Sequence, residues 1–145
     1  MSATRFVPIL VLLVVSGIKS LLECDEEVKL LCFEGELRQI LVNLVSNAFD
    51  AMRLGGTLRI RISQTSNSGV RKVRIVSADT GCGMSPQERS HLFEPFFSTK
   101  GIGGTGLGLW ITRDLVSQNH GTIDIRSSAR IGRSGTVARL RFYPG

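Results

Sequence analysis

The order of helix-like and strand-like segments after residue 35 constrains the fold of this chain most. Residues 36–53 carry apolar side chains at helical spacing, which predicts a helix with one buried face. These apolar positions are Leu37, Ile40, Leu41, Leu44, Val45, Ala48 and Met52. Four later segments alternate between apolar and polar residues as strands do, at 57–63, 70–78, 121–127 and 136–143.

Two further helices are predicted between the second and third of these strands. The stretch Ser85-Pro86-Gln87-Glu88 is a capping box with proline at the first helical position, which predicts a short helix to about Leu92. A second helix begins at Thr105, a plausible N-cap, with Leu107, Ile111 and Leu115 facing inward. We therefore expect an α/β two-layer sandwich, in which helices cover one face of a mixed, mostly antiparallel sheet.

Composition is consistent with one domain spanning residues 1–145. With 42% hydrophobic and 21% charged residues, the chain can bury a core and is not generally disordered. The net charge of +6 favours an anionic partner, such as a nucleotide, a nucleic acid or an acidic membrane surface. Three cysteines without metal-ligand spacing indicate reduced thiols and a cytoplasmic domain, whether or not a parent protein is membrane-anchored.

An apolar run occupies residues 6–15, FVPILVLLVV. A membrane-spanning helix needs about 20 apolar residues, so this run does not predict a span. The sequence that follows, Ser16-Gly17-Ile18-Lys19, is a poor signal-peptide cleavage site. We expect the run to be a buried first element of the domain.

A glycine-rich string, STKGIGGTGLGLW, covers residues 98–110. It satisfies G-x-G-x-x-G, but Pro95 in the preceding segment argues against the buried strand that a dinucleotide fold requires. It lacks the Lys-Ser/Thr of a P-loop, and it leads into a helix rather than joining two strands as a protein-kinase loop does. The free N–H groups at the start of that helix predict a phosphate site over residues 104–108.

Two other groups of polar residues suit a nucleotide. Asn43 and Asn47 lie four residues apart on the first helix, with Glu36 and Asp50 expected on the same polar stripe. Carboxamide oxygens can bind Mg²⁺ alongside phosphates and water. The Asp79-Thr-Gly-Cys-Gly83 segment follows a strand, where a carboxylate could accept a hydrogen bond from an adenine amine beside glycines that let a flat ring approach.

These segments, in this order, resemble the catalytic ATP-binding domain of two-component sensor histidine kinases, within the wider ATPase group of gyrase, Hsp90 and MutL. Residues 43–48 resemble the N box, 79–83 the G1 box, 93–97 the F box and 104–109 the G2 box. The resemblance covers about residue 28 to the end. It implies a Bergerat-type ATP-binding fold with a mobile lid at about residues 84–105. The Asn-Ala-Phe-Asp-Ala-Met form of the N box resembles the nitrogen-regulation-like subgroup.

The resemblance also implies residue roles. Asn47 would bind Mg²⁺, Asn43 would support the phosphates, and Lys100 would be a lid cation that reaches the terminal phosphate. Asp79 would accept the adenine amine between Gly81 and Gly83, and Thr136 belongs to the last family element. Phosphate contacts are implied for Gly104, Thr105, Gly106, Leu107 and Gly108, and lid anchoring for Phe93, Phe96 and Phe97.

Position 43 separates two activities within this group. The hydrolysing relatives carry a glutamate there to activate water, whereas an asparagine cannot serve as that base. The resemblance therefore implies transfer of the γ-phosphoryl group of ATP to a histidine on a phosphoacceptor domain of a homodimeric parent kinase, with a response regulator downstream. An ATP-hydrolysing relative and a non-catalytic nucleotide sensor are the alternatives.

Some positions depart from the family pattern. Asp50 and Ala51 stand where many members have a lysine and an aromatic residue, and neither His91 nor His120 lies in a phosphoacceptor motif. Arginines on the polar sides of the strands favour a solvated sheet face over a nucleic-acid platform. They are Arg59, Arg61, Arg74, Arg126, Arg139 and Arg141.

Overall fold

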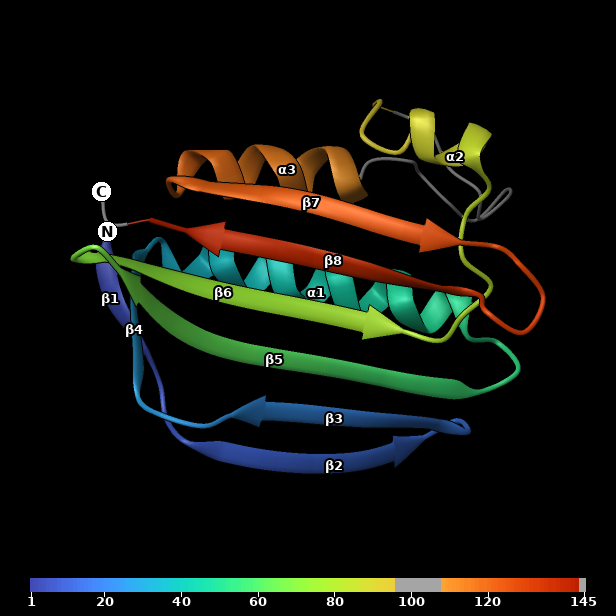
Figure 1. Ribbon diagram of the computed structural model, residues 1–145, viewed down its shortest axis with the longest axis horizontal. Helices are drawn as coiled ribbons and strands as arrows, with labels where there is room; N and C mark the ends of the chain where they lie inside the picture. Colours follow the sequence, from blue (N-terminus) through green and yellow to red (C-terminus); the bar gives the residue numbers. More distant parts are fainter. Residues whose placement is uncertain (96–107, 144–145) are drawn as a thin grey trace.

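The computed structural model describes residues 1–95 and 108–143. Within these ranges the predicted sandwich is confirmed: helices pack on one face of a six-stranded sheet with strand order β2-β3-β5-β6-β8-β7 (Figure 1). Of the described strand pairs, only β3 and β5 run parallel, and the others are antiparallel. A separate two-stranded sheet joins β1 to β4.

The helices and strands follow the predicted order, with small shifts at their ends. The helices are α1 (Glu34–Ala51), α2 (Pro86–Ser90) and α3 (Gly108–Gln118). The strands that sequence patterns predicted are β5 (Gly56–Asn67), β6 (Val70–Asp79), β7 (Gly121–Ser128) and β8 (Gly135–Phe142). Four strands that were not predicted precede α1: β1 (Ser2–Phe6), β2 (Ile9–Val15), β3 (Ile18–Cys24) and β4 (Val28–Cys32).

The main core lies between α1 and the centre of the sheet. Leu37, Ile40 and Leu44 of α1 pack against Ile75 and Leu140, which are fully buried on β6 and β8. This is the face that the helical spacing predicted. On α3 the fully buried residues are Thr112 and Val116, and the predicted inward residues Ile111 and Leu115 are only partly buried.

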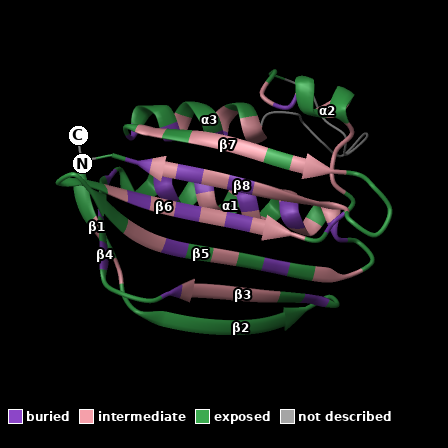
Figure 2. Cartoon of the chain, in the orientation of Figure 1, coloured by how far each residue is buried: buried purple, intermediate pink, exposed green. Residues whose placement is uncertain are grey.

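The prediction for the apolar run was wrong. Residues 9–15 form β2, which is the outermost strand of the sheet, and every one of its residues is exposed (Figure 2). The physical reason is that α1 and α3 cover strands farther from this edge of the sheet, so no described helix covers β2. Among the described residues, no helix is long and apolar enough to cross a membrane.

Candidate functional site

The site begins where α1 meets the start of α3. A Cβ atom added to Gly108 would lie 3.8 Å from both Oδ1 and Nδ2 of Asn47, so the Asn47 side chain faces the first turn of α3. Asn43 lies one turn earlier on α1. Its Nδ2 donates to Thr112 Oγ1 at 3.2 Å and to the Gly108 carbonyl oxygen at 3.4 Å. Both predicted amides therefore meet the predicted helix start.

Both the oxygen and the nitrogen of the Asn43 carboxamide form hydrogen bonds. Its Oδ1 accepts a hydrogen bond from Gln39 Nε2 at 2.8 Å, while its Nδ2 points to α3. Thr112 also donates to the Gly108 carbonyl at 2.6 Å. Sequence reasoning missed Thr112, because a threonine at an apolar position of a helix looks like ordinary core. In the structure it is fully buried and joins Asn43 to the first residue of α3.

The other two residues of the predicted polar stripe lie away from this site. Glu36 Oε2 accepts a hydrogen bond from Asn119 at 2.8 Å, near the far end of α3. Asp50 lines a shallow, mainly apolar groove with Val42 and Phe49. Phe49 packs toward β3 and β5, so this groove lies on the flank of α1 opposite to α3. Helical spacing alone could not distinguish Glu36 and Asp50 from the two asparagines, because these positions differ in which neighbouring elements lie beside them.

Asp79 ends β6 at the same end of the sheet. One of its carboxylate oxygens accepts a hydrogen bond from the Gly81 N–H at 2.9 Å, and Thr136 is its cross-strand partner on β8. Burial raises the pKa of the Asp79 carboxyl, and the hydrogen bonds from the Gly81 and Thr136 N–H groups lower it in part. Strand pairing thus brings together two residues, Asp79 and Thr136, that were predicted separately as site residues.

Gly81 and Gly83 are required by the packing of the protein itself. A Cβ at Gly81 would lie 2.5 Å from the Ala51 carbonyl oxygen, and Cys82 donates its N–H to that oxygen at 2.9 Å. A Cβ at Gly83 would lie 1.8 Å from the Ser128 carbonyl oxygen, and Gly83 has a positive φ of 68°. The small Ala51 therefore leaves space for the loop after β6 to pack against the end of α1.

The start of the predicted lid is fixed to the strands. The Met84 N–H donates to Ser127 Oγ at 2.8 Å, and Ser127 Oγ lies 2.8 Å from Thr136 Oγ1. Ser127 was not predicted, since nothing in the local sequence marks a serine at a strand end. The predicted capping box of α2 is confirmed, with Ser85 and Glu88 each bonded to the other's backbone N–H.

The end of the described lid segment lies on α3. The Arg113 guanidinium stacks over the Phe93 ring, 4.9 Å from its centroid, which anchors the first F-box residue through a cation–π contact. Several predicted site residues lie outside the described residues. These are Phe96, Phe97, Lys100, Gly104, Thr105, Gly106 and Leu107.

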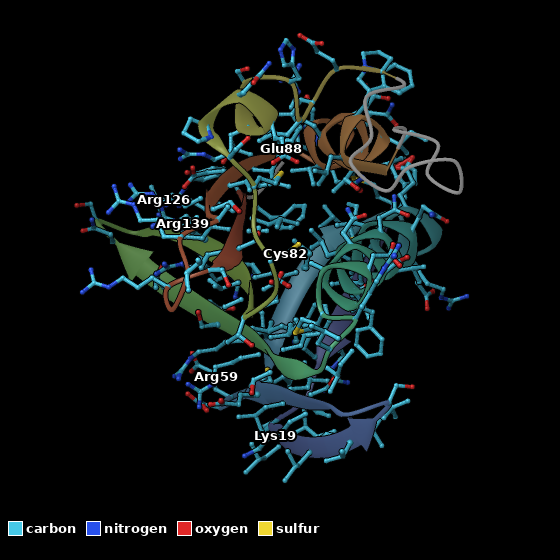
Figure 3. All side chains as sticks on the ribbon, turned by 90° about the vertical axis from the view of Figure 1, so that its right-hand side faces the viewer. Lys19, Arg59, Cys82, Glu88, Arg126 and Arg139 are labelled. Atoms are coloured by element: carbon cyan, nitrogen blue, oxygen red, sulfur yellow. The ribbon has the colours of Figure 1, made fainter. Side chains whose placement is uncertain are left out.

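Figure 3 looks at the end of the sheet where Cys82 lies between α1 and the strands. Arg126 and Arg139 lie on the sheet face away from α1, as predicted. Part of this charge is neutralised, because Arg139 pairs with Asp124 and Arg59 Nε lies 3.0 Å from Glu23 Oε1. Such pairing is typical of a solvated sheet face rather than a continuous basic platform.

Residues 33–144 match the model of the family described as histidine kinase-, DNA gyrase B- and HSP90-like ATPase. The chain belongs to this family. The sensor histidine kinase ZraS of Klebsiella oxytoca is 37% identical over 107 residues, which are 74% of this chain and 21% of ZraS. The chain therefore spans about a fifth of the length of this curated relative.

Solved structures place the fold in the same family. The mycobacterial sensor histidine kinase MprB superposes with a TM-score of 0.74 at 25% identity, over 88% of this chain and 83% of that one. A full-length ShkA structure, in complex with AMPPNP, gives a TM-score of 0.72 at 29% identity, over 88% of this chain and 26% of that one. The expected Bergerat-type fold is confirmed, and membership of this ATPase family implies the use of ATP.

The described residues suit a bound nucleotide and could supply one side chain, Asn47, as a metal ligand. Among the described residues near Gly108, a Cβ would meet only Asn47, and at ordinary contact distance, so packing against these described residues does not require a glycine here. No described group of three His, Cys, Asp or Glu residues could hold a metal ion by itself. Asn47 has one carboxamide oxygen to offer, and Mg²⁺ takes one or two protein oxygens together with phosphates and water.

Proposed function

We propose that residues 1–145 are the catalytic ATP-binding domain of a two-component sensor histidine kinase. In this proposal the chain binds Mg-ATP and donates the γ-phosphoryl group to a histidine on a helical phosphoacceptor domain of a homodimeric parent protein, which then serves a response regulator. The observation that carries the proposal is the meeting of two amides, Asn43 and Asn47, with the start of α3 at Gly108.

Asp79 is the proposed adenine acceptor. Its carboxylate has spare lone pairs beyond the bond from Gly81, and it is partly buried, which raises its pKa. A hydrogen bond from an exocyclic amine gains strength in such surroundings. Gly81, Gly83 and Thr136 shape this end of the site. The two glycines do so by letting the loop pack against α1 and β7.

Asn47 is the proposed metal ligand, and Gly108 lies at the proposed phosphate end. When bound, Mg²⁺ supplies charge neutralisation and positioning of the phosphates. The free N–H groups of the first turn of α3 bind phosphate, and the glycine allows close approach. We assign Gly104, Thr105, Gly106 and Leu107 to the same phosphate contact and Lys100 to the terminal phosphate, on the strength of the family resemblance.

Asn43 favours a kinase over a hydrolase. It is a carboxamide, and its two ends are already bonded to Gln39 and to Thr112 of α3. It therefore holds α1 against α3 and cannot take a proton from water. A histidine acceptor needs no such base, since an imidazole is itself a nucleophile, and catalysis rests on positioning and charge neutralisation.

Calorimetry tests the site assignment. We expect Mg-dependent ATP binding by the full chain, with at least a tenfold loss of affinity in Asn47→Ala and in Asp79→Asn, or about 1.4 kcal/mol. Gln118→Ala, which removes an exposed amide from the far end of α3, is the matched control and should bind normally. Unchanged affinity in both site variants would rule out the assignment.

Phosphoryl transfer tests the activity. The chain is mixed with γ-labelled ATP and a separately produced phosphoacceptor domain of a sensor histidine kinase. Labelled acceptor, with little release of free phosphate, is the expected result. Steady release of phosphate without acceptor labelling would indicate a hydrolase, and nucleotide binding with neither reaction would indicate a nucleotide-sensing module.

A further inference from the structure

Strand β2 (Ile9–Val15) forms an edge of the main sheet that carries no protection against pairing. Its seven residues are all Ile, Leu or Val, and each is 39–71% exposed (Figure 2). Its pairing with β3 is continuous from Ile9 to Val15, without a bulge. Natural edge strands are usually blunted by charge, proline or bulges, and β2 has none of these within its length.

The hairpin geometry shows which backbone groups lie on the open edge. Val15 pairs with Ile18 across a two-residue turn in which Ser16 and Gly17 both have positive φ, which is a type I′ hairpin. The residues that flank such a turn form a hydrogen-bonded pair, and the pairs alternate from there. The N–H and C=O groups of Leu10, Leu12 and Val14 therefore point away from β3, toward the open edge.

We propose that β2 is the pairing edge of a homodimer, in which two copies join antiparallel about a two-fold axis at Leu12. Residues whose N–H and C=O groups point toward the open edge must pair with each other, and in β2 these are the even-numbered residues. The residue numbers of any such pair therefore add up to an even number. The register in which paired residue numbers add up to 24 brings all seven residues of each strand into pairs. It pairs Leu12 with Leu12 of the second copy, and Leu10 with Val14, so that the three outward residues exchange bonds.

A second copy is the occupant that the residues favour. In this register every cross-strand pair is apolar on both faces, including Ile9 with Val15 and Val11 with Leu13. Full burial of one such side chain removes on the order of 100 Å² from water. Seven half-exposed residues thus offer several hundred Å² per copy, which is below the about 800 Å² per partner of a standard stable interface. The dimer is therefore reversible.

Charge makes a further distinction. The chain carries a net charge of +6, so two copies repel each other, while β2 itself is uncharged. Added salt screens this repulsion and should strengthen the dimer, whereas it would weaken a partner attracted by the positive charge. An apolar helix is the competing occupant. It would lie on the groove of α1 and on the helix-facing residues of β2, Val11 and Leu13, and it would leave the open edge unpaired.

Sedimentation equilibrium of the full chain tests the proposal. We expect a monomer–dimer equilibrium that salt strengthens. Leu12→Lys and Leu12→Glu each place like charges opposite each other at the two-fold axis, so each variant alone should dissociate at least tenfold more readily. An equimolar mixture of the two should dimerise again, because opposite charges then meet. Ile131→Lys, which changes an exposed isoleucine in the β7–β8 loop, is the control and should dimerise normally.

Hydrogen exchange supplies the second readout. The amides of Leu10, Leu12 and Val14 should become protected as protein concentration rises, while those of Val11 and Leu13, already bonded to β3, should not change. A wild-type chain that stays monomeric at high salt would overturn the proposal, as would failure of the mixture to dimerise. Association that Leu13→Lys abolishes and Leu12→Lys leaves intact would overturn it in favour of the groove.

Discussion

Gly83 and Gly108 are both glycines of the proposed site, but different demands keep them glycine. At Gly83 an added Cβ would overlap the Ser128 carbonyl oxygen, and φ is positive. At Gly108 the only described neighbour of such a Cβ is Asn47, at 3.8 Å. The fold therefore requires the first glycine, whereas the described residues leave room beside the second that a ligand could use.

Alanine at these two positions should give opposite results. We expect Gly83→Ala to lower the free energy of unfolding by at least about 2 kcal/mol, because of the overlap and the left-handed backbone. Gly108→Ala should leave unfolding unchanged or slightly improved, since alanine favours helix, but should weaken ATP binding at least tenfold. Denaturant unfolding and calorimetry measure the two effects. Normal ATP binding by Gly108→Ala would exclude phosphate contact at this residue.

Asp79 predicts how nucleotide binding depends on pH. Burial raises the pKa of its carboxyl above the ordinary value of 3.8, and binding of an amine donor favours the ionised form. Affinity for ATP should therefore fall as pH drops through the raised pKa, beginning above the range of an exposed aspartate. Calorimetry of Asp79→Asn is the comparison, because any protonation of the nucleotide itself remains in that variant. An identical pH profile in both proteins would contradict the role of Asp79.

The raised pKa of Asp79 gives stability the opposite pH dependence to that of ATP affinity. Between pH 3.8 and the raised pKa, the folded chain binds more protons at Asp79 than the unfolded chain does. The contribution of Asp79 to stability is therefore present below that window and is lost as pH rises through it. Asp79 at neutral pH thus favours ligand binding at the expense of folding.

At the scale of elements, Asn119 holds the N-terminus of α1 to the C-terminus of α3. The N-cap residue of α1 is Phe33, whose side chain cannot cap, and its N–H donates to Asn119 Oδ1 at 2.9 Å. Asn119 Nδ2 donates to Glu36 and to the Leu115 carbonyl, both at 2.8 Å. The Asn119 side chain is 1% exposed, so these bonds are made away from water.

Loss of this junction should destabilise the fold. We expect Asn119→Leu to lower the free energy of unfolding by about 2–3 kcal/mol, because it leaves buried groups on α1 and α3 without partners. Gln118→Ala, at the neighbouring exposed position, should change it by less than about 0.5 kcal/mol. Urea unfolding followed by circular dichroism compares the two. Equal stability of both variants would show that the junction contributes nothing measurable.

At the scale of the whole molecule, the reactivity of the three cysteines tests the packing. Cys24 and Cys32 are buried in the core and Cys82 is exposed in the loop beside the site. We expect a thiol reagent to label one cysteine per folded chain and all three in denaturant, and ATP to slow the labelling of Cys82. Mass spectrometry counts and locates the labels. Rapid labelling of Cys24 or Cys32 in the folded chain would contradict this arrangement.

Much of the fold could be predicted from the sequence. The helical face of α1, the capping box of α2 and the strands β5 to β8 follow from periodicities of consecutive residues. The strands before α1 were missed, although Val28, Leu30 and Cys32 alternate with polar or exposed residues as a strand does. Strand β2 is apolar at all seven positions and so shows no alternation, and no local signal marks the parallel pairing of β3 with β5.

The sequence by itself determined the order of elements and the positions of Asn43, Asn47 and Asp79 on them, because a box motif and a period are local properties of the chain. Only the tertiary structure decided that Asn43 bonds to Thr112, that Asp79 pairs with Thr136, and that β2 is exposed. These outcomes depend on which elements become neighbours. Among the described residues, α1 and α3 lie over the sheet away from β2, so this apolar edge strand is exposed whatever its own hydrophobicity.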